Sequence, residues 1–200
     1  MRLLDRWPKG REGFVLALAA GVIAALLGSA AAIYTWGESG GDESSIPTAE
    51  NTATRSGDAL VPVVSRAGGF SVTAPEELVG DELARGVKLS TQSGDIVITV
   101  GSTGRQGLAA GHRTALDAIR STFPKMKVEK AVPTTLGSLE ARRSIGVVRR
   151  ARGDDVVFSV TTGVLQRRTW SVVMFASRDI SPERIEKFYQ PVLDGFRPAK

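Results

Sequence analysis

The fold of this chain is decided by residues 139–176, LEARRSIGVVRRARGDDVVFSVTTGVLQRRTWSVVMFA. Three stretches rich in β-branched and aromatic residues occur there, separated by Gly153-Asp154 and Gln166-Arg167 at turn positions. Strands joined by short turns pair with their neighbours in antiparallel fashion. The sequence therefore predicts an antiparallel meander of Leu139 to Arg150, Val156 to Leu165 and Arg168 to Ala176.

Further strands are expected on the N-terminal side of this meander. Phe70 to Pro75 alternates in polarity and stops at proline, as a short strand does. Val87 to Thr91 and Ile96 to Val100 flank Ser93-Gly94-Asp95, a pattern typical of a β-hairpin. Lys127 to Val132 is one more strand candidate.

Two helices complete the predicted domain. Leu116, Ile119 and Phe123 recur at helical spacing between Gly111 and Pro124. A second helix is expected to begin at Ser181 as the cap, with Pro182 at its first position. Its buried stripe is predicted to hold Ile185, Phe188, Tyr189, Val192 and Phe196. Residues 66–200 should therefore form an α+β domain, an antiparallel sheet of about six to seven strands covered by two or more helices.

A membrane-spanning segment is expected ahead of this domain. From Phe14 to Trp36 there are 23 residues without a charge, which make roughly 34 Å of helix against a hydrocarbon core of about 30 Å. Four basic residues precede the segment, whereas acidic residues follow it, so residues 1–13 should be a cytoplasmic tail. The chain is thus predicted to be a single-pass membrane protein whose C-terminal domain is extracytoplasmic.

A cleaved signal peptide is the alternative for the same segment. The small residues Ala30-Ala31-Ala32 would offer a cleavage site after Ala32. Against it, the apolar stretch exceeds the usual length of such a region and continues to Trp36. Both interpretations export the domain.

The connection between the membrane segment and the domain differs from the domain in composition and charge. Residues 37–65 are rich in Gly, Ser, Thr and acidic side chains, which is typical of a flexible, disordered linker. They carry five acidic and one basic side chain, whereas residues 66–200 carry 21 basic and 14 acidic ones. A basic domain on an acidic tether favours anionic partners.

The order of these elements resembles the PsbP-like superfamily over residues 66–198. The two ends carry the resemblance best: Gly69-Phe70-Ser71-Val72 and Leu193-Asp194-Gly195-Phe196. LpqN-type actinobacterial envelope proteins belong to that superfamily, and the composition fits an actinobacterial origin. The resemblance implies a sheet covered by helices and an accessory that binds a partner rather than an enzyme. It transfers no functional residues, and the membrane anchor lies outside it.

Catalytic and metal-binding signatures are missing from the sequence. Cysteine is absent, which excludes disulfides, thiolate zinc sites and a cysteine nucleophile. His112 is the single histidine, so a serine-histidine-acid triad would have to be built around it. We interpret His112 as a solvated or capping residue. An exported hydrolase built on it is the alternative function, and a structural scaffold of an envelope complex is another.

The predicted binding residues are arginines. The glycine-rich stretch from Gly101 to Gly111 is expected to be a surface loop, and as a contact loop with Arg105 and Arg113 it would bind an anionic group on a partner. Adjacent strand residues point to opposite faces, so Arg142 and Arg143 cannot share one side. The predicted partner is a protein or an anionic envelope component, neither nucleic acid nor a cofactor or metal. The candidate partner-binding residues are Arg105, Arg113, Arg142, Arg149, Arg150, Arg167 and Arg168.

Overall fold

The computed structural model describes residues 59–149 and 155–199. The predicted cytoplasmic tail, the membrane segment Phe14 to Trp36 and most of the linker lie outside these residues, as does Arg150. Within the described part of the chain, no helix is both long enough and apolar enough to cross a membrane.

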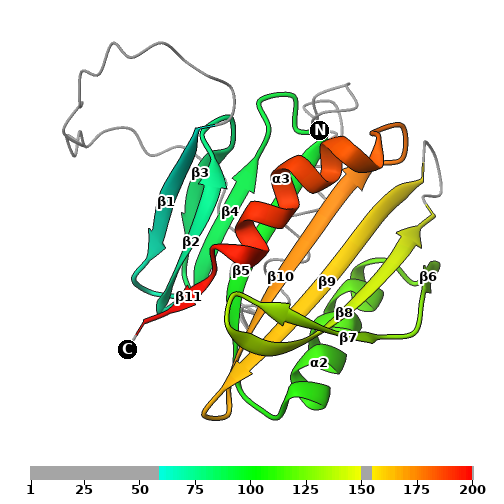
Figure 1. Cartoon of the computed structure of the whole chain (residues 1–200). Helices are drawn as coiled ribbons and strands as arrows, with labels where there is room; N and C mark the ends of the chain where they lie inside the picture. Colours follow the sequence, from blue (N-terminus) through cyan, green and yellow to red (C-terminus); the bar gives the residue numbers. More distant parts are fainter. Residues whose placement is uncertain (1–58, 150–154, 200) are drawn as a thin grey trace, which may run out of the picture.

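The predicted meander forms the centre of a large antiparallel sheet (Figure 1). Its strands are β8 (Leu139–Val148), β9 (Val156–Leu165) and β10 (Arg168–Ser177). Strands β9 and β10 pair over their whole length, from Arg168 opposite Leu165 to Ser177 opposite Val156. The three strands and the turn at Gln166-Arg167 are therefore confirmed.

The predicted hairpin extends this sheet on the other side of β10. It consists of β4 (Gly86–Ser90) and β5 (Ile96–Arg105), and β5 pairs with β10. Asp95 in the hairpin turn accepts hydrogen bonds from Thr91 and Ser93 and forms an ion pair with Arg184. The sequence missed β3 (Val79–Leu83), which pairs with β4 at the edge of the sheet.

The strand predicted from Lys127 to Val132 is wrong in its bounds. Two short strands, β6 (Met126–Val128) and β7 (Val132–Leu136), lie along the same edge of β8. They pair with its opposite halves, and residues 129–131 interrupt the ladder between them. Eight strands thus make the large sheet, more than the six to seven expected.

A second sheet of three strands was not predicted. It holds β1 (Leu60–Ser65), β2 (Phe70–Pro75) and β11 (Arg197–Pro198), with β2 in the middle. Because β1 pairs with β2 along six residues, the linker cannot extend to residue 65 as predicted. The composition of residues 37–65, taken as an average, concealed the apolar run from Leu60 to Val64 at the end of this segment.

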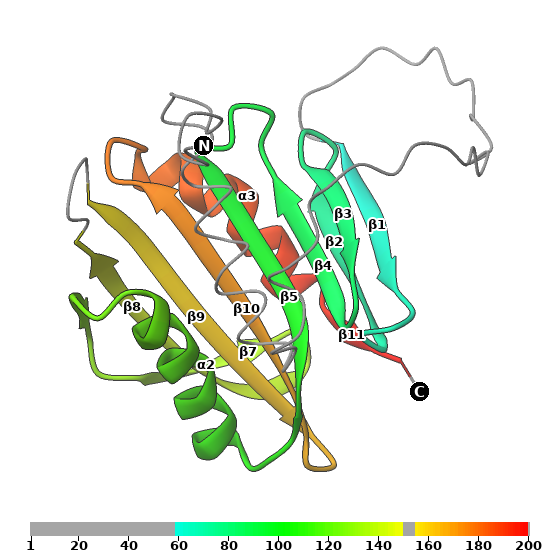
Figure 2. The same ribbon diagram turned by 180° about the vertical axis from the view of Figure 1, so that it is seen from behind.

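The two helices cover opposite faces of the large sheet (Figures 1 and 2). Helix α2 (Leu108–Thr122) buries Ala115 and Ile119, and helix α3 (Pro182–Asp194) is capped by the hydroxyl of Ser181. Both helices are confirmed, although α2 begins three residues earlier than predicted. The stretch from Gly101 to Gly111 is therefore not a loop, because β5 continues to Arg105 and α2 begins at Leu108.

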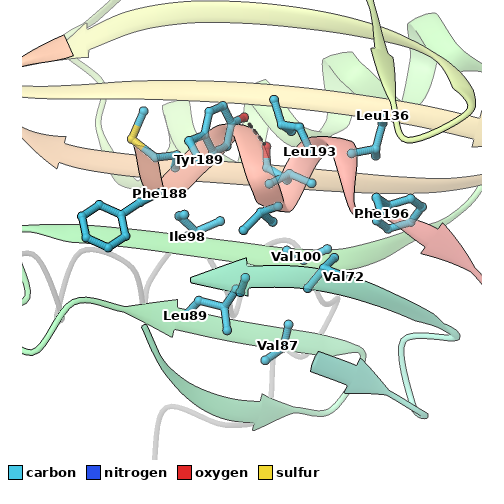
Figure 3. Packing of buried hydrophobic residues seen from close by; sticks show 14 of the residues in the cluster. Val72, Val87, Leu89, Ile98, Val100, Leu136, Phe188, Tyr189, Leu193 and Phe196 are labelled. Carbon is cyan, nitrogen blue, oxygen red and sulfur yellow. Dashed lines mark hydrogen bonds between the residues drawn. The ribbon is translucent and has the colours of Figure 1, made fainter. Parts of the chain in front are cut away.

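The larger hydrophobic core lies between α3 and the two sheets (Figure 3). Phe188, Tyr189 and Leu193 of α3 pack there with side chains of β2, β4 and β5. Phe196, just beyond α3, stacks on Phe70 with ring centroids 5.5 Å apart and therefore joins the small sheet to the helix. A second cluster fills the space under α2.

Candidate functional site: an arginine-lined hollow at one end of the sheet

Three of the predicted arginines gather around one hollow of about 510 Å³. Arg105 ends β5, Arg167 lies in the turn after β9, and Arg168 begins β10. The end of β5 and the β9–β10 turn lie at the same end of the sheet (Figure 1). The hollow that their residues line is called the arginine hollow below. Its lining residues are Arg105, Leu165, Gln166, Arg167, Arg168, Trp170 and Ala199.

The turn that presents Arg167 has an uncommon composition. Gln166 and Arg167 have φ angles of 49° and 65°, the left-handed region that two-residue hairpin turns require. Asn-Gly is the favoured pair in such turns, because side chains like those of Gln and Arg cost about 1 to 2 kcal/mol each there. The strained turn places the long cationic side chain of Arg167 at the rim of the hollow.

A β-bulge directs the end of β5 toward the arginine hollow. The register between β5 and β10 shifts between Thr169 and Trp170, which leaves Thr103 as the extra residue. The hydroxyl groups of Thr103 and Thr169 lie 2.7 Å apart and hold the bulge closed. Bulges bend a strand and redirect its side chains, and here Arg105 is brought directly opposite Arg168.

The guanidinium group of Arg168 is held in place by the turn before β2. Its Nη2 donates a hydrogen bond of 3.0 Å to the carbonyl oxygen of Gly68, and its Cζ lies 5.1 Å from the centre of the Trp170 ring. The indole nitrogen of Trp170 donates to the same carbonyl oxygen at 3.2 Å. Arg168 is thus oriented before any ligand arrives.

A second, adjoining hollow of about 390 Å³ adds two cations that the sequence did not single out. Arg66 and Arg197 line it, together with Gly69 and Ala199. No acidic side chain is found among the described residues that line either hollow. Sequence patterns did not single out Arg66 and Arg197, because β11 brings them together and a strand of two residues shows no alternation of apolar and polar residues.

The other predicted arginines do not join this site. Arg113 is exposed on α2, and Arg149 lies just past the far end of β8. Arg142 lies on the α2 side of the sheet, whereas Arg143 lies on the α3 side, 5.3 Å from the centre of the Tyr189 ring. The predicted separation of Arg142 and Arg143 onto opposite faces is confirmed.

His112 is buried, and its predicted role as a solvated or capping residue is wrong. Its Nε2 lies 3.0 Å from the hydroxyl of Ser144, and its Nδ1 lies 3.2 Å from that of Thr162. Burial lowers the pKa of His112 below its ordinary value, and the positive charge of Arg142 lowers it further. The sequence missed this contact because it joins α2 to β8 and β9 across the packed sheet.

This polar cluster does not have the arrangement of a catalytic triad. Nδ1 of a triad histidine faces a carboxylate, whereas here it faces a threonine hydroxyl. Ser144 is only 2% exposed, so its hydroxyl offers no path to a substrate. The cluster instead satisfies polar groups beneath α2, as buried groups require. Within the described residues there is also no group of three potential metal ligands.

Comparisons with known proteins give likenesses of structure alone. No protein-family profile matches the chain, and no curated protein matches it significantly. The Ran-binding protein Mog1p of Saccharomyces cerevisiae is 8% identical, with a TM-score of 0.52 over 71% of this chain and 96% of that one. Cyanobacterial PsbP of Synechocystis is 9% identical, with a TM-score of 0.52 over 74% of this chain and 98% of that one.

A third structure, LpqN of Mycobacterium tuberculosis, is 14% identical over 72% of this chain and 88% of that one, with a TM-score of 0.49. That protein is described as involved in cell envelope biogenesis. At this score, LpqN adds nothing to the assignment of the fold.

Proposed function

We propose that this chain, which has the PsbP-like fold, is a non-catalytic accessory protein that binds a protein or envelope component outside the cell membrane. The PsbP-like fold supports this class of function, since Mog1p, which shares it, is a Ran-binding protein. Fold alone does not determine function, so the proposal depends on the site. The observation that carries it is the arginine hollow, where Arg105, Arg167 and Arg168 converge.

The arginine hollow suits recognition better than chemistry. It holds cations and two exposed apolar side chains, Leu165 and Ala199. None of its described lining residues is a carboxylate, a histidine or a serine that could transfer a proton or attack a substrate. Arginine is the residue most suited to binding an anionic group in a fixed geometry. Binding through this site should therefore be sensitive to salt and proceed without turnover.

Membrane attachment through Phe14 to Trp36 is part of the proposal. The 23 uncharged residues, with basic residues before them and acidic ones after them, support a cytoplasmic N-terminus and an extracytoplasmic domain. We extend the proposal to an actinobacterial envelope, which fits the composition and the resemblance to LpqN-type proteins at the sequence level.

A single-cysteine labelling experiment tests the topology, because the chain has no cysteine of its own. Gln166→Cys should react with a membrane-impermeant maleimide in intact cells. Asp5→Cys should react only after lysis. Reaction of Asp5→Cys in intact cells, or loss of residue 5 from the mature protein, would overturn the anchor.

A crosslinking pull-down from native membranes tests partner binding. The full-length protein should recover a defined partner, and the double variant Arg105→Ser/Arg167→Ser should lose most of it. Arg142→Ser/Arg149→Ser removes the same charge away from the hollow and serves as the matched control. Equal recovery with both double variants would reject the arginine hollow as the binding site.

The two alternative functions lack the features they would require. A hydrolase needs an accessible nucleophile beside His112, and Ser144 is buried. A scaffold would be favoured by an exposed apolar patch on α3. The large hydrophobic side chains exposed among the described residues lie elsewhere: Leu60, Val64, Val79, Val132, Ile145 and Leu165.

A further inference from the structure

We infer that the arginine hollow binds one oxyanion group, a phosphate or a carboxylate, on a small ligand or polymer unit that lies outside the anchoring membrane. The inference deepens the proposed function and rests on it for the position of the anchor. It depends on four properties of the hollow: its charge balance, the donors it presents, its size and its direction.

The charge balance of the hollow is unfavourable without a ligand. Arg105 and Arg168 are directly opposite each other across the β5–β10 ladder, and like charges in that relation destabilise a sheet. Arg167 adds a third positive charge next to them. Among the described residues, none of these three arginines forms an ion pair. An oxyanion between them would replace repulsion with attraction.

The donors of the hollow match an oxyanion. A guanidinium group has five N–H donors, and Arg168 uses one hydrogen bond to Gly68 to fix its orientation. Arg105 and Arg167 are exposed and free to turn toward a ligand. Two guanidinium groups that flank a third, fixed one can bind a carboxylate or phosphate with paired hydrogen bonds, which are among the strongest in proteins.

The size of the hollow indicates a ligand larger than a bare ion. A volume of about 510 Å³ lies within the range of sites that hold small organic ligands. Leu165 supplies an apolar wall for the part of the ligand that carries the anion. A broad protein interface fits less well, because such interfaces have aromatic residues at their centre and Trp170 is only 2% exposed. A sugar phosphate or a uronic acid unit has suitable dimensions.

The hollow is directed away from the point where the anchor joins the domain. Strand β1 begins at Leu60, and its other end, Ser65, lies beside Arg66 and Gly69 of the adjoining hollow. Five strand steps separate Leu60 from Ser65 and place Leu60 about 17 Å from that end. In Figure 1 the start of β1 and the β9–β10 turn occupy opposite ends of the domain. Lipid head groups of the anchoring membrane reach the hollow only when the linker lets the domain turn over, which makes them the less suitable oxyanions.

Calorimetry on the full-length protein in nanodiscs of uncharged lipid tests the inference. Inorganic phosphate, a hexose phosphate and a hexuronic acid are titrated at constant ionic strength. We expect saturable binding of the hexose phosphate or of the hexuronic acid. Arg105→Gln/Arg167→Gln should weaken it at least about tenfold, because the variant removes two charged donors that form charge-assisted hydrogen bonds. Arg142→Gln/Arg149→Gln should bind as the wild type does.

Three results would overturn the inference. The first is the absence of saturable binding of any of these ligands, and the second is equal binding by both double variants. The third comes from nanodiscs that contain phosphatidylglycerol: an approximately tenfold weaker binding of the ligand there would mean that membrane lipid occupies the hollow. Capture of a protein partner in the pull-down without any oxyanion binding would reject this inference and leave the proposed function standing.

Discussion

Arg105 and Arg168 are paired Cα to Cα across the ladder between β5 and β10, so two positive charges meet where the sheet ends. Cross-strand pairs of opposite charge stabilise a sheet, and pairs of like charge destabilise it. The bulge at Thr103 and the left-handed turn at Gln166-Arg167 converge on the same point. Three local departures from the most stable arrangement thus occur at one place, which is typical of a functional site.

Substitutions in the turn at residues 166 and 167 should raise the stability of the domain and weaken partner binding. The double substitution Gln166→Asn/Arg167→Gly supplies the pair that the left-handed turn favours. We expect the free energy of unfolding to rise by about 1 to 2 kcal/mol, measured by urea denaturation. Partner recovery in the pull-down should fall. Gln166→Asn alone retains Arg167 and is the control, and a double variant that binds fully would contradict a role for Arg167.

Gly69→Ala should disturb Arg168 without removing it. Gly69 has a φ of 64°, and a Cβ atom there would lie 2.5 Å from Nη2 of Arg168. We expect a loss of about 1 to 2 kcal/mol of unfolding free energy from the backbone strain, together with weaker partner binding. Gly94→Ala is the matched control, since Gly94 has a φ of 69° in the distant β4–β5 turn. If both variants bind equally well, the orientation of Arg168 is unimportant.

Phe196 should be among the most sensitive positions of the core. It is fully buried and packs against both Phe70 and Trp170, with ring centroids 5.5 and 5.8 Å away. Phe196→Ala should lower the free energy of unfolding by about 3 to 5 kcal/mol, measured by chemical denaturation. Phe196→Leu should cost clearly less. A loss below about 1 kcal/mol for the alanine variant would contradict the packing of β11 and α3 described above.

The stability of the domain should depend on the ionisation of His112. Burial lowers the pKa of His112 in the folded state below 6.5, the value expected in the unfolded chain. The unfolded state therefore binds the proton more readily, and the free energy of unfolding should fall as the pH drops below about 6.5. The loss should end once the pH passes the lowered pKa of the folded state.

The variant His112→Gln isolates this effect, because an amide side chain can bond to Ser144 or Thr162 but does not titrate. Urea denaturation of both proteins between about pH 7.5 and pH 5 should show a steeper decline for the wild type. Parallel declines would mean that other groups account for the pH dependence.

Sequence patterns predicted the strands that carry a dense β-branched signal, and they failed where burial is one-sided or pairing is brief. Strand β3 is exposed along almost its entire length, so it shows no apolar alternation. Strand β11 has two residues and exists because Phe196 anchors the chain beside β2. In both cases tertiary contacts, rather than local preference, determine the strand.

Only part of the candidate site could be predicted, again because tertiary contacts determine how its residues meet. Arg167 and Arg168 adjoin strand ends that the pattern located, whereas Arg105 was a candidate as part of the predicted loop from Gly101 to Gly111. Their meeting depends on the β5–β10 pairing and on the bulge at Thr103, which joins residues more than sixty positions apart. Arg113 was grouped with Arg105 because both were expected to act with one contact loop. That loop does not exist, since β5 continues to Arg105 and α2 begins at Leu108.

Site-specific photocrosslinking in native membranes tests the central claim most directly. A photoreactive amino acid replaces Gln166 at the rim of the arginine hollow, and in a second protein it replaces Asp117 on the exposed side of α2. The account predicts a defined crosslinked species from position 166 that Arg105→Ser removes, and none from position 117. Identical products from both positions, or a product at 166 that persists with Arg105→Ser, would contradict it.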